Sequence, residues 1–342
     1  MTALYKFVLR RVGLAALSLW GVATIVFVIS KLIPGDVARV AAGRLATADQ
    51  VAHMRELLGL NDPLYVQYAG YISRLVQGNL GTSTITRQSV VGDLAAVLPT
   101  TIQLVLLGML ITVLIAAPVG IAAAVSEGKA ADIVARIFLV TSGGVPVFWL
   151  AIMMRWVLGS ILGWFPISGT NSVDGGPPTV TGFTVLDSLL FGTVGNLADS
   201  VFHLILPALA LSAPFVSTLA RLIRSNMMTA LKADYITFAI SKGVPRRRVI
   251  LRHAFRSALG SVLTVFGMQF GWMISAAVLV EAVFGLPGIG SYLYRAIINQ
   301  DTFSVLASVL VIGFVFIATS FIVDLLQMAI DPRVRRAQLG AA

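Results

Sequence analysis

Six long runs of hydrophobic residues, separated by shorter polar stretches, dominate the pattern of this chain. The runs cover Leu9–Lys31, Leu98–Val125, Ile133–Trp164, Val201–Ser225, Ala258–Ala282 and Phe303–Ile330. An α-helix rises about 1.5 Å per residue, so runs of this length can cross the roughly 30 Å hydrocarbon core of a bilayer. The pattern therefore predicts an all-α membrane protein with about six transmembrane helices.

Three of these runs contain features that refine the prediction. The third run holds the segment Gly143–Pro146, where we expect a break, and the fourth holds Pro207 and Pro214, which we expect to kink the helix without ending it. In the first run, Val12–Ser30 carries no charge over 19 residues. That length exceeds the roughly 7–15 apolar residues of a secretory signal, so we predict an uncleaved first transmembrane helix.

Composition agrees with a bilayer as the solvent. Of the 342 residues, 57% are hydrophobic and only 12% are charged, against roughly 25% charged residues in an ordinary soluble domain. The mean hydropathy is +0.90. The chain has no cysteine, which excludes disulfides, thiolate metal sites and cysteine nucleophiles.

Positive charge sets the expected orientation. The net charge is +10, and most of the 25 Lys and Arg residues flank the runs on the side that holds the N-terminus. By the positive-inside rule, both termini are predicted to be cytoplasmic. The connection Phe165–Ser200 has no Lys or Arg, as an exported loop should. Because the charge follows the topology, we expect no nucleic-acid partner.

These assignments divide the chain into four parts. Residues 1–31 form the cytoplasmic N-terminal end and the first span, and residues 32–97 form an exported segment with short amphipathic helices. Residues 98–330 form the transmembrane core, which includes an exported loop at 165–200 and a cytoplasmic loop at 226–257. Residues 331–342 form a cytoplasmic tail.

The exported segment carries local helix signals of its own. Thr47 and Gln50 have capping-box spacing, and Gly59 is placed to end the short helix that they begin. A second amphipathic stretch is predicted to start at Pro63. Its apolar face comprises Leu64, Tyr68, Tyr71, Ile72 and Leu75.

The cytoplasmic loop 226–257 reads as two short helices joined by a tight turn. Asp234 is placed to cap the first helix, Gly243 to supply a left-handed turn residue, and Pro245 to open the second helix. Apolar side chains lie among basic ones, at Ile236, Phe238, Ala239, Ile240, Val249 and Ile250. Such a surface fits a groove on another protein. On pattern alone, a basic loop that only obeys the topology rule is an equally good interpretation.

A resemblance favours the docking interpretation. The loop resembles the EAA loop of ABC importer permeases, with Thr237-Phe238-Ala239 at the Glu-Ala-Ala positions and Gly243 at the glycine. Thr237 and Phe238 depart from the usual residues. The oligopeptide/dipeptide (peptide/nickel) subgroup is most similar, through Asp234-Tyr235, Ala239, Lys242-Gly243, Arg246-Arg247-Arg248 and Arg252-His253-Ala254. Further segments similar to that subgroup are Leu32–Asp36, Leu58–Leu64, Gly78–Ser83, Val280–Gly290 and Asp331–Arg335.

The resemblance implies a type I importer bundle in a prokaryotic plasma or inner membrane. A second homologous permease would complete the pathway, two ATPase subunits would dock on the loop, and an extracytoplasmic solute-binding protein would deliver the solute. The residues implied in ATPase coupling are Asp234, Tyr235, Thr237, Phe238, Ala239, Lys242, Gly243, Arg247, Arg252 and His253. The chain has no Gly-x-x-x-x-Gly-Lys-Ser/Thr motif. ATP and Mg²⁺ are therefore expected on the partner subunits, with no cofactor and no catalytic residue on this chain.

Three residues are candidates for the solute path or a gate. Arg155 is a charge within the third run, Trp149 belongs to the outer half of the same run, and Glu281 lies near the end of the fifth run. For each, a structural role is the competing interpretation: a paired arginine, an aromatic belt residue and a helix cap. The three histidines lack metal-ligand spacing, so no metal is expected.

Two other functions remain as alternatives. A self-sufficient secondary transporter or channel would need several embedded acids or a duplicated bundle, and a membrane-anchored assembly protein would need no transport role. Within the favoured family, the solute stays open between dipeptides, longer peptides, nickel complexes and glutathione.

Overall fold

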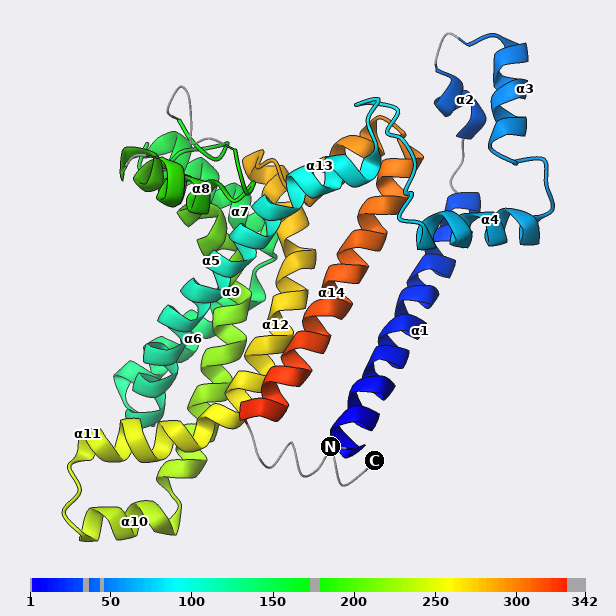
Figure 1. Cartoon of the computed structure of the whole chain (residues 1–342). Coiled ribbons are helices and arrows are strands. Elements are labelled where there is room, and N and C mark those ends of the chain that lie inside the picture. The colour runs from blue at the N-terminus through cyan, green and yellow to red at the C-terminus, as the bar shows by residue number, and fades with distance from the viewer. Residues whose placement is uncertain (1, 33–36, 44–45, 173–178, 193, 331–342) are drawn as a thin grey trace.

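The computed structural model describes residues 2–32, 37–43, 46–172, 179–192 and 194–330, and in these ranges it is a helical protein (Figure 1). In chain order, the helices of the described ranges are α1 (Thr2–Leu32), α2 (Val37–Ala42), α3 (Ala48–Leu57), α4 (Leu64–Val76), α5 (Val90–Val125), α6 (Ala130–Gly144), α7 (Val147–Met154), the π-helical η1 (Arg155–Ile161), α8 (Thr184–Phe191), α9 (Val194–Leu231), α10 (Asp234–Ser241), α11 (Arg246–Arg248), the π-helical η2 (Val249–Ala254), α12 (Phe255–Phe284), α13 (Ile289–Ile298) and α14 (Thr302–Ile330). The only strand-like pairing in the described ranges is a bridge between Thr82 and Ser89.

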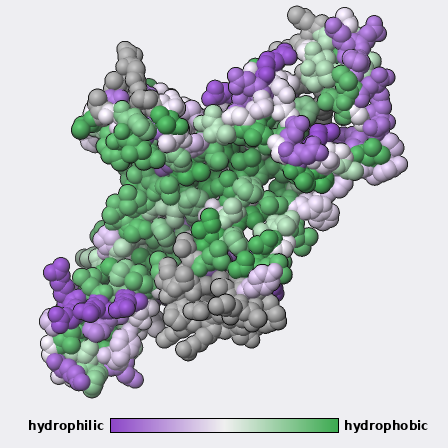
Figure 2. All heavy atoms as spheres, in the orientation of Figure 1, coloured by the Kyte–Doolittle hydropathy of each residue, from purple (hydrophilic) through white to green (hydrophobic). Residues whose placement is uncertain are grey.

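Within the described ranges, five helices are long and apolar enough to cross a membrane, and a sixth crossing follows if α6 and the α7–η1 helix count as one bent span. On the face shown in Figure 2, apolar residues cover the middle of the bundle, and polar residues gather beyond them near α10 and α11 at one end and near α3 at the other. We call the first of these the α10 end, and the second, where α13 also lies (Figure 1), the α13 end. On α5, Leu106, Leu110 and Leu114 form an exposed stripe one turn apart. Such a stripe is stable where lipid or another apolar surface covers it.

Helix α9 is the centre of the packing. It contacts α5 along most of its length and also packs against α12 and α6, while α14 packs on α12 and α1 packs on α14 (Figure 1). Two buried clusters fill the bundle. One, toward the α13 end, includes Leu104, Leu204 and Phe284. The other, toward the α10 end, includes Leu219 and Met227.

The predicted break in the third run is confirmed. Helix α6 ends at Gly144, and the axis of α7–η1 is turned from it by 102°. Val145 has extended backbone angles, φ −91° and ψ 131°, as a residue before proline prefers, and Pro146 precedes the first turn of α7. Pro207 and Pro214 lie inside α9 without ending it, as expected.

The short helices before α5 agree in part with prediction. Thr47 and Gln50 form the reciprocal capping box at the start of α3, and Gly59 follows that helix with φ +63°. Pro63 occupies the N-cap of α4, one position earlier than expected. Tyr71, Ile72 and Leu75 pack against α1 and α14, whereas Leu64 stays exposed.

Other predictions fall where the structure gives no test. Ile33–Asp36, Asp331–Arg335 and the tail 331–342 lie outside the described residues. The four-part division of the chain and the cytoplasmic placement of its termini stay predictions.

Candidate functional site: the α10 loop and the α13 end

Helix α10 stands away from the bundle at the end that also holds the N-terminus (Figure 1). The chain leaves α9 at Leu231, forms α10, turns at Lys242–Pro245 and returns through α11 and η2 into α12. One residue anchors α10: Ile236 is buried in the α10-end core beside Val249. Apart from the half-buried Ala239, the other residues of α10 are exposed.

Gly243 ends α10 in a hydrogen-bonded turn. Its φ is +74°, a left-handed value that glycine adopts without a steric penalty. The Gly243 N–H donates to the Ile240 carbonyl (N···O 2.9 Å), and the Val244 N–H donates to the Ala239 carbonyl (3.1 Å). These two bonds form a Schellman motif, which satisfies the last carbonyls of α10. The left-handed turn predicted at Gly243 is confirmed, whereas its part in coupling stays a prediction.

The ten predicted coupling residues lie together on this loop. Eight are exposed, and Ala239 and His253 are half-buried. Phe238 and Ile240 expose 61% and 60% of their surface, and the Lys242 ammonium lies 4.4 Å from the centre of the Phe238 ring. The loop therefore offers an apolar pair bordered by positive charge, the composition expected of a docking surface.

Three local predictions for the loop need correction. Asp234 does not cap α10, because Ala233 is the N-cap and no side chain caps it; the Asp234 carboxylate still lies in the first turn, where the helix dipole favours it. Pro245 lies one position before the second helix. Ile236 and Val249, predicted as outward apolar residues, are buried.

A buried ion pair joins α6 to α9 at the α10 end. The Asp132 side chain is 1% exposed and accepts two hydrogen bonds from the Arg224 guanidinium, at 2.8 and 3.0 Å. The Gly128 N–H also donates to Asp132 (3.1 Å), and Arg136 lies 3.6 Å away. Sequence reasoning did not single out this pair, because its members are 92 residues apart.

Asp132→Asn is expected to lower the free energy of unfolding by about 3 kcal/mol, because it leaves the Arg224 charge without its buried partner. The measurement is the thermal unfolding midpoint in detergent. Glu127→Gln is the matched control, since Glu127 pairs with Lys232 (3.1 Å) where both side chains are exposed, and such pairs contribute about 0–1 kcal/mol. Equal midpoints for the two variants would show that the Asp132 pair does not stabilise the bundle.

Glu281 fixes the start of α13 at the opposite end. Its side chain is fully buried, and one carboxylate oxygen accepts the Gly290 N–H at 2.7 Å. The adjacent Ile289 N–H donates to the Thr101 hydroxyl of α5 at 2.9 Å. Helix α12 ends at Phe284, and its C-cap residue Gly285 has a left-handed φ of +59°. Glu281 and Thr101 therefore hold the first turn of α13 against α12 and α5.

Arg155 reaches the same place from η1. Its guanidinium donates to the carbonyl of Val283, in the last turn of α12. The structure thus brings Arg155 and Glu281, two of the three predicted path residues, to the C-terminal end of one helix. Trp149 is 48% exposed on α7, and no hydrogen bond or ring contact in the described ranges joins it to either residue. A solute contact for these three residues stays a prediction.

Asp301 holds the segment around Ser83 against the start of α14. This carboxylate is fully buried before α14 and accepts hydrogen bonds from the Ser83 hydroxyl (2.7 Å), the Thr84 N–H (3.0 Å) and the Ser304 hydroxyl (2.9 Å). Nearby, burial raises the pKa of Tyr292 to about 12. Sequence analysis missed Asp301, since nothing local marks a partner 218 residues from Ser83.

Asp187 organises the connection between η1 and α9. Its carboxylate accepts the Thr181 N–H and hydroxyl (2.9 and 2.6 Å) and the Gly182 N–H (3.1 Å). Burial alone would raise the pKa of this carboxyl, but the hydrogen bonds together hold its pKa below the usual range.

This lowered pKa predicts a pH dependence. A carboxyl whose pKa is lower in the folded state stabilises that state above the pKa of the unfolded chain, about 3.9. The contribution is lost as the pH falls from there through the folded-state pKa. The unfolding midpoint of the wild type should therefore exceed that of Asp187→Asn at pH 7, and the gap should narrow below about pH 4. A gap that is independent of pH would contradict the assignment.

The comparisons with known proteins identify the class. A bundle of membrane-spanning helices with an outward loop is the architecture of a multi-pass permease component, and the profile described as "Binding-protein-dependent transport system inner membrane component" matches residues 116–336. A profile for the N-terminal region of such membrane components matches residues 4–105. The chain belongs to this family, as a permease subunit of ABC importers in the bacterial plasma membrane. A permease component is not itself catalytic.

Named relatives align over almost the whole chain. The di/tripeptide transport system permease protein DppB of Pseudomonas aeruginosa is 37% identical over 96% of this chain and 98% of its own length. The probable D,D-dipeptide transport system permease protein DdpB of Escherichia coli is 39% identical over 92% and 93%. The glutathione transport system permease protein GsiC of Salmonella choleraesuis is 35% identical over 96% and 99%.

In the described part of the chain, no group of three or more His, Cys, Asp and Glu side chains is arranged to hold a metal ion.

Proposed function

We propose that this chain forms half of the translocation pathway of an importer for dipeptides, oligopeptides or a related small solute. A second homologous permease completes the pathway, and an extracytoplasmic binding protein delivers the solute. Support comes from relatives named for dipeptides, D,D-dipeptides, di/tripeptides and glutathione, which align over 92–96% of this chain. The basic α10 end faces the cytoplasm in this proposal, in accord with the positive-inside rule.

Two separate ATPase subunits supply the energy and bind ATP and Mg²⁺. The observation that carries this proposal is the α10 loop: a hydrogen-bonded helical projection whose apolar residues Phe238 and Ile240 are exposed beside a row of arginines. A groove on a partner would bury this pair, and an aromatic anchor buried in such a groove is a common source of binding energy.

The docking role is tested by co-purification of the ATPase subunits with the membrane complex. Phe238→Ala is expected to weaken their retention about tenfold, the effect of losing one buried aromatic anchor. The matched control is Phe191→Ala on α8, because Phe191 is 53% exposed at the opposite end. If both variants retain the ATPases like the wild type, α10 is not the docking element.

Transport is tested with the assembled complex in proteoliposomes. Uptake of a labelled dipeptide should require ATP, the ATPase subunits and the binding protein. Uptake by this chain alone, driven by an ion gradient, would instead establish the alternative of a self-sufficient secondary transporter.

A further inference from the structure

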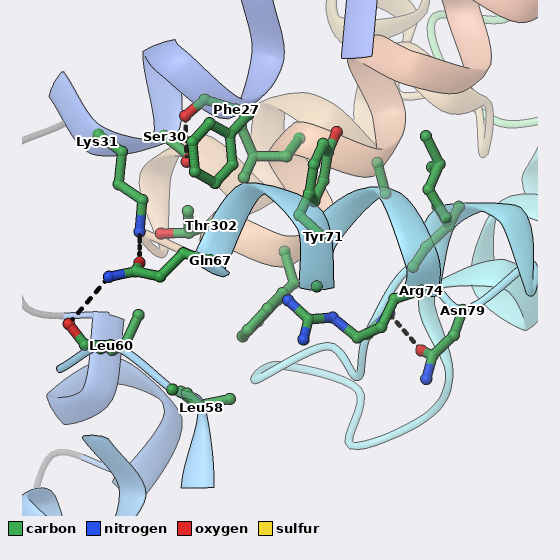
Figure 3. A pocket seen from close by; sticks show the side chains of 18 of the residues that line it. Phe27, Ser30, Lys31, Leu58, Leu60, Gln67, Tyr71, Arg74, Asn79 and Thr302 are labelled. Carbon is green, nitrogen blue, oxygen red and sulfur yellow. Dashed lines mark hydrogen bonds between the residues drawn. The ribbon is translucent and has the colours of Figure 1, made fainter. Parts of the chain in front are cut away.

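A pocket lies beside the bundle at the α13 end, between α1, α4 and the start of α14 (Figure 3). Its volume is about 790 Å³, within the range of small-molecule sites. The proposed transport function uses none of its residues.

Hydrogen bonds hold the mouth of the pocket in shape. The Lys31 ammonium at the end of α1 donates to the Gln67 side-chain carbonyl of α4. The Gln67 amide in turn donates to the carbonyls of Leu60 (3.1 Å) and Asp62 (2.6 Å). Figure 3 shows the bond from Lys31 to Gln67 and the bond from Gln67 to Leu60. Gln67 therefore fastens the end of α1, the turn after α3 and α4 into one wall.

Positive charge predominates at this mouth. Among the described residues that line the pocket, Lys31, Arg55 and Arg74 are cationic and Asp62 is acidic. Arg74 is close enough for its charge to act on Lys31. No hydrogen bond or ion pair in the described ranges engages the Arg74 guanidinium, which points into the pocket (Figure 3). Two neighbouring cations favour an anion between them, and a guanidinium suits the oxygens of a phosphate.

Below the mouth the pocket is apolar. Phe27, Leu75, Leu306 and Leu310 line it. Thr302 opens α14 at the mouth, and Leu310 is eight residues further along the helix, a depth of about 12 Å at 1.5 Å per residue. Lys31 is the penultimate residue of its span. The cations therefore lie where two spans leave the apolar belt, and the apolar wall extends into it.

We propose that this pocket binds an anionic phospholipid, with the headgroup phosphate at Lys31 and Arg74 and an acyl chain against Phe27, Leu306 and Leu310. A free phosphate shares the charged contacts, but only a lipid matches both the charged mouth and the apolar wall. A positively charged mouth beside an apolar wall suits both the headgroup and the acyl chain of such a lipid.

The test measures lipid retained by the purified, delipidated full-length protein in native mass spectrometry. The probes are phosphatidylglycerol, phosphatidylcholine and inorganic phosphate. Wild type should retain phosphatidylglycerol in preference to phosphatidylcholine, and Arg74→Gln should retain about tenfold less, the loss of one charge-assisted contact. Arg39→Gln is the matched control, because Arg39 is an exposed arginine on α2 outside the pocket.

Three outcomes would overturn the proposal. They are equal retention of both lipids, equal loss in the Arg74 and Arg39 variants, and displacement of phosphatidylglycerol by millimolar inorganic phosphate. If Arg74→Gln lowers the unfolding midpoint, its loss of lipid could reflect misfolding, and hydrogen exchange on the wild type then tests the proposal. Phosphatidylglycerol, but not phosphatidylcholine, should then slow exchange in the Gln67–Leu75 amides.

Discussion

Gly243→Pro is expected to abolish ATP-driven uptake while the chain still inserts into the membrane. Proline fixes φ near −65° and has no N–H, whereas Gly243 has φ +74° and donates to Ile240. The turn that aims α10 outward cannot form with this residue, yet the apolar spans that drive insertion are unchanged. The measurements are uptake by the reconstituted complex and the amount of chain in washed membranes.

Gly78→Pro is a closely matched control for this experiment. Gly78 has φ +73°, its N–H donates to the Leu75 carbonyl at 3.0 Å, and the Asn79 N–H donates to the Arg74 carbonyl. The same motif thus ends α4, far from the α10 loop. ATP hydrolysis that responds to solute and binding protein should survive in Gly78→Pro and be lost in Gly243→Pro. Coupled hydrolysis in both variants would show that the α10 turn is dispensable.

Gly290→Ala is expected to lower the free energy of unfolding by about 3 kcal/mol, through overpacking and the loss of two hydrogen bonds. An added Cβ would lie 2.3 Å from the Val278 Cα and 2.5 Å from the Val278 carbonyl oxygen. These are backbone atoms of α12, so the strain cannot be relieved by a rotamer change. The first turn of α13 must move away from Glu281 and Thr101 instead. The thermal unfolding midpoint and the uptake rate should both fall.

The control for this substitution has the opposite expected sign. Gly13 lies inside α1, and a Cβ there would meet nothing within 4 Å. Gly13→Ala should therefore be neutral or stabilising by about 0.5–1 kcal/mol, through the smaller entropy of the unfolded chain. A wild-type midpoint for Gly290→Ala would show that α13 is not docked on α12 as the structure places it.

Features encoded over a few residues were predictable from the sequence. The spans, the break at Gly143–Pro146, the capping box at Thr47 and the left-handed turn at Gly243 each depend on neighbouring residues, and each is confirmed. Helix ends were predicted less well. Helix α9 runs over Val194–Leu231, beyond the predicted Val201–Ser225, because hydropathy marks only the part of a helix that matches lipid.

Features that join distant parts of the chain were not predictable. The Asp132–Arg224 pair and the Asp301–Ser83 bond connect residues whose own surroundings in the sequence are unremarkable. From the sequence, Ile236 and Phe238 were both predicted as apolar residues of the docking surface. Packing on the bundle buries Ile236 and leaves Phe238 exposed. Arg155 and Glu281 were suggested as path residues by their charge. Their convergence on the end of α12 required the fold.

The length of helix α12 determines how far a tilt at one of its ends moves the other end. It begins at Phe255, directly after η2, and ends at Phe284, so its 30 residues span about 45 Å. Since α13 is clamped to its far end, a tilt of about 5° about its base would sweep that end, and α13 with it, sideways by about 4 Å at this length. A small rotation imposed where the arginines lie would thus become a displacement of atomic size on the opposite side of the membrane.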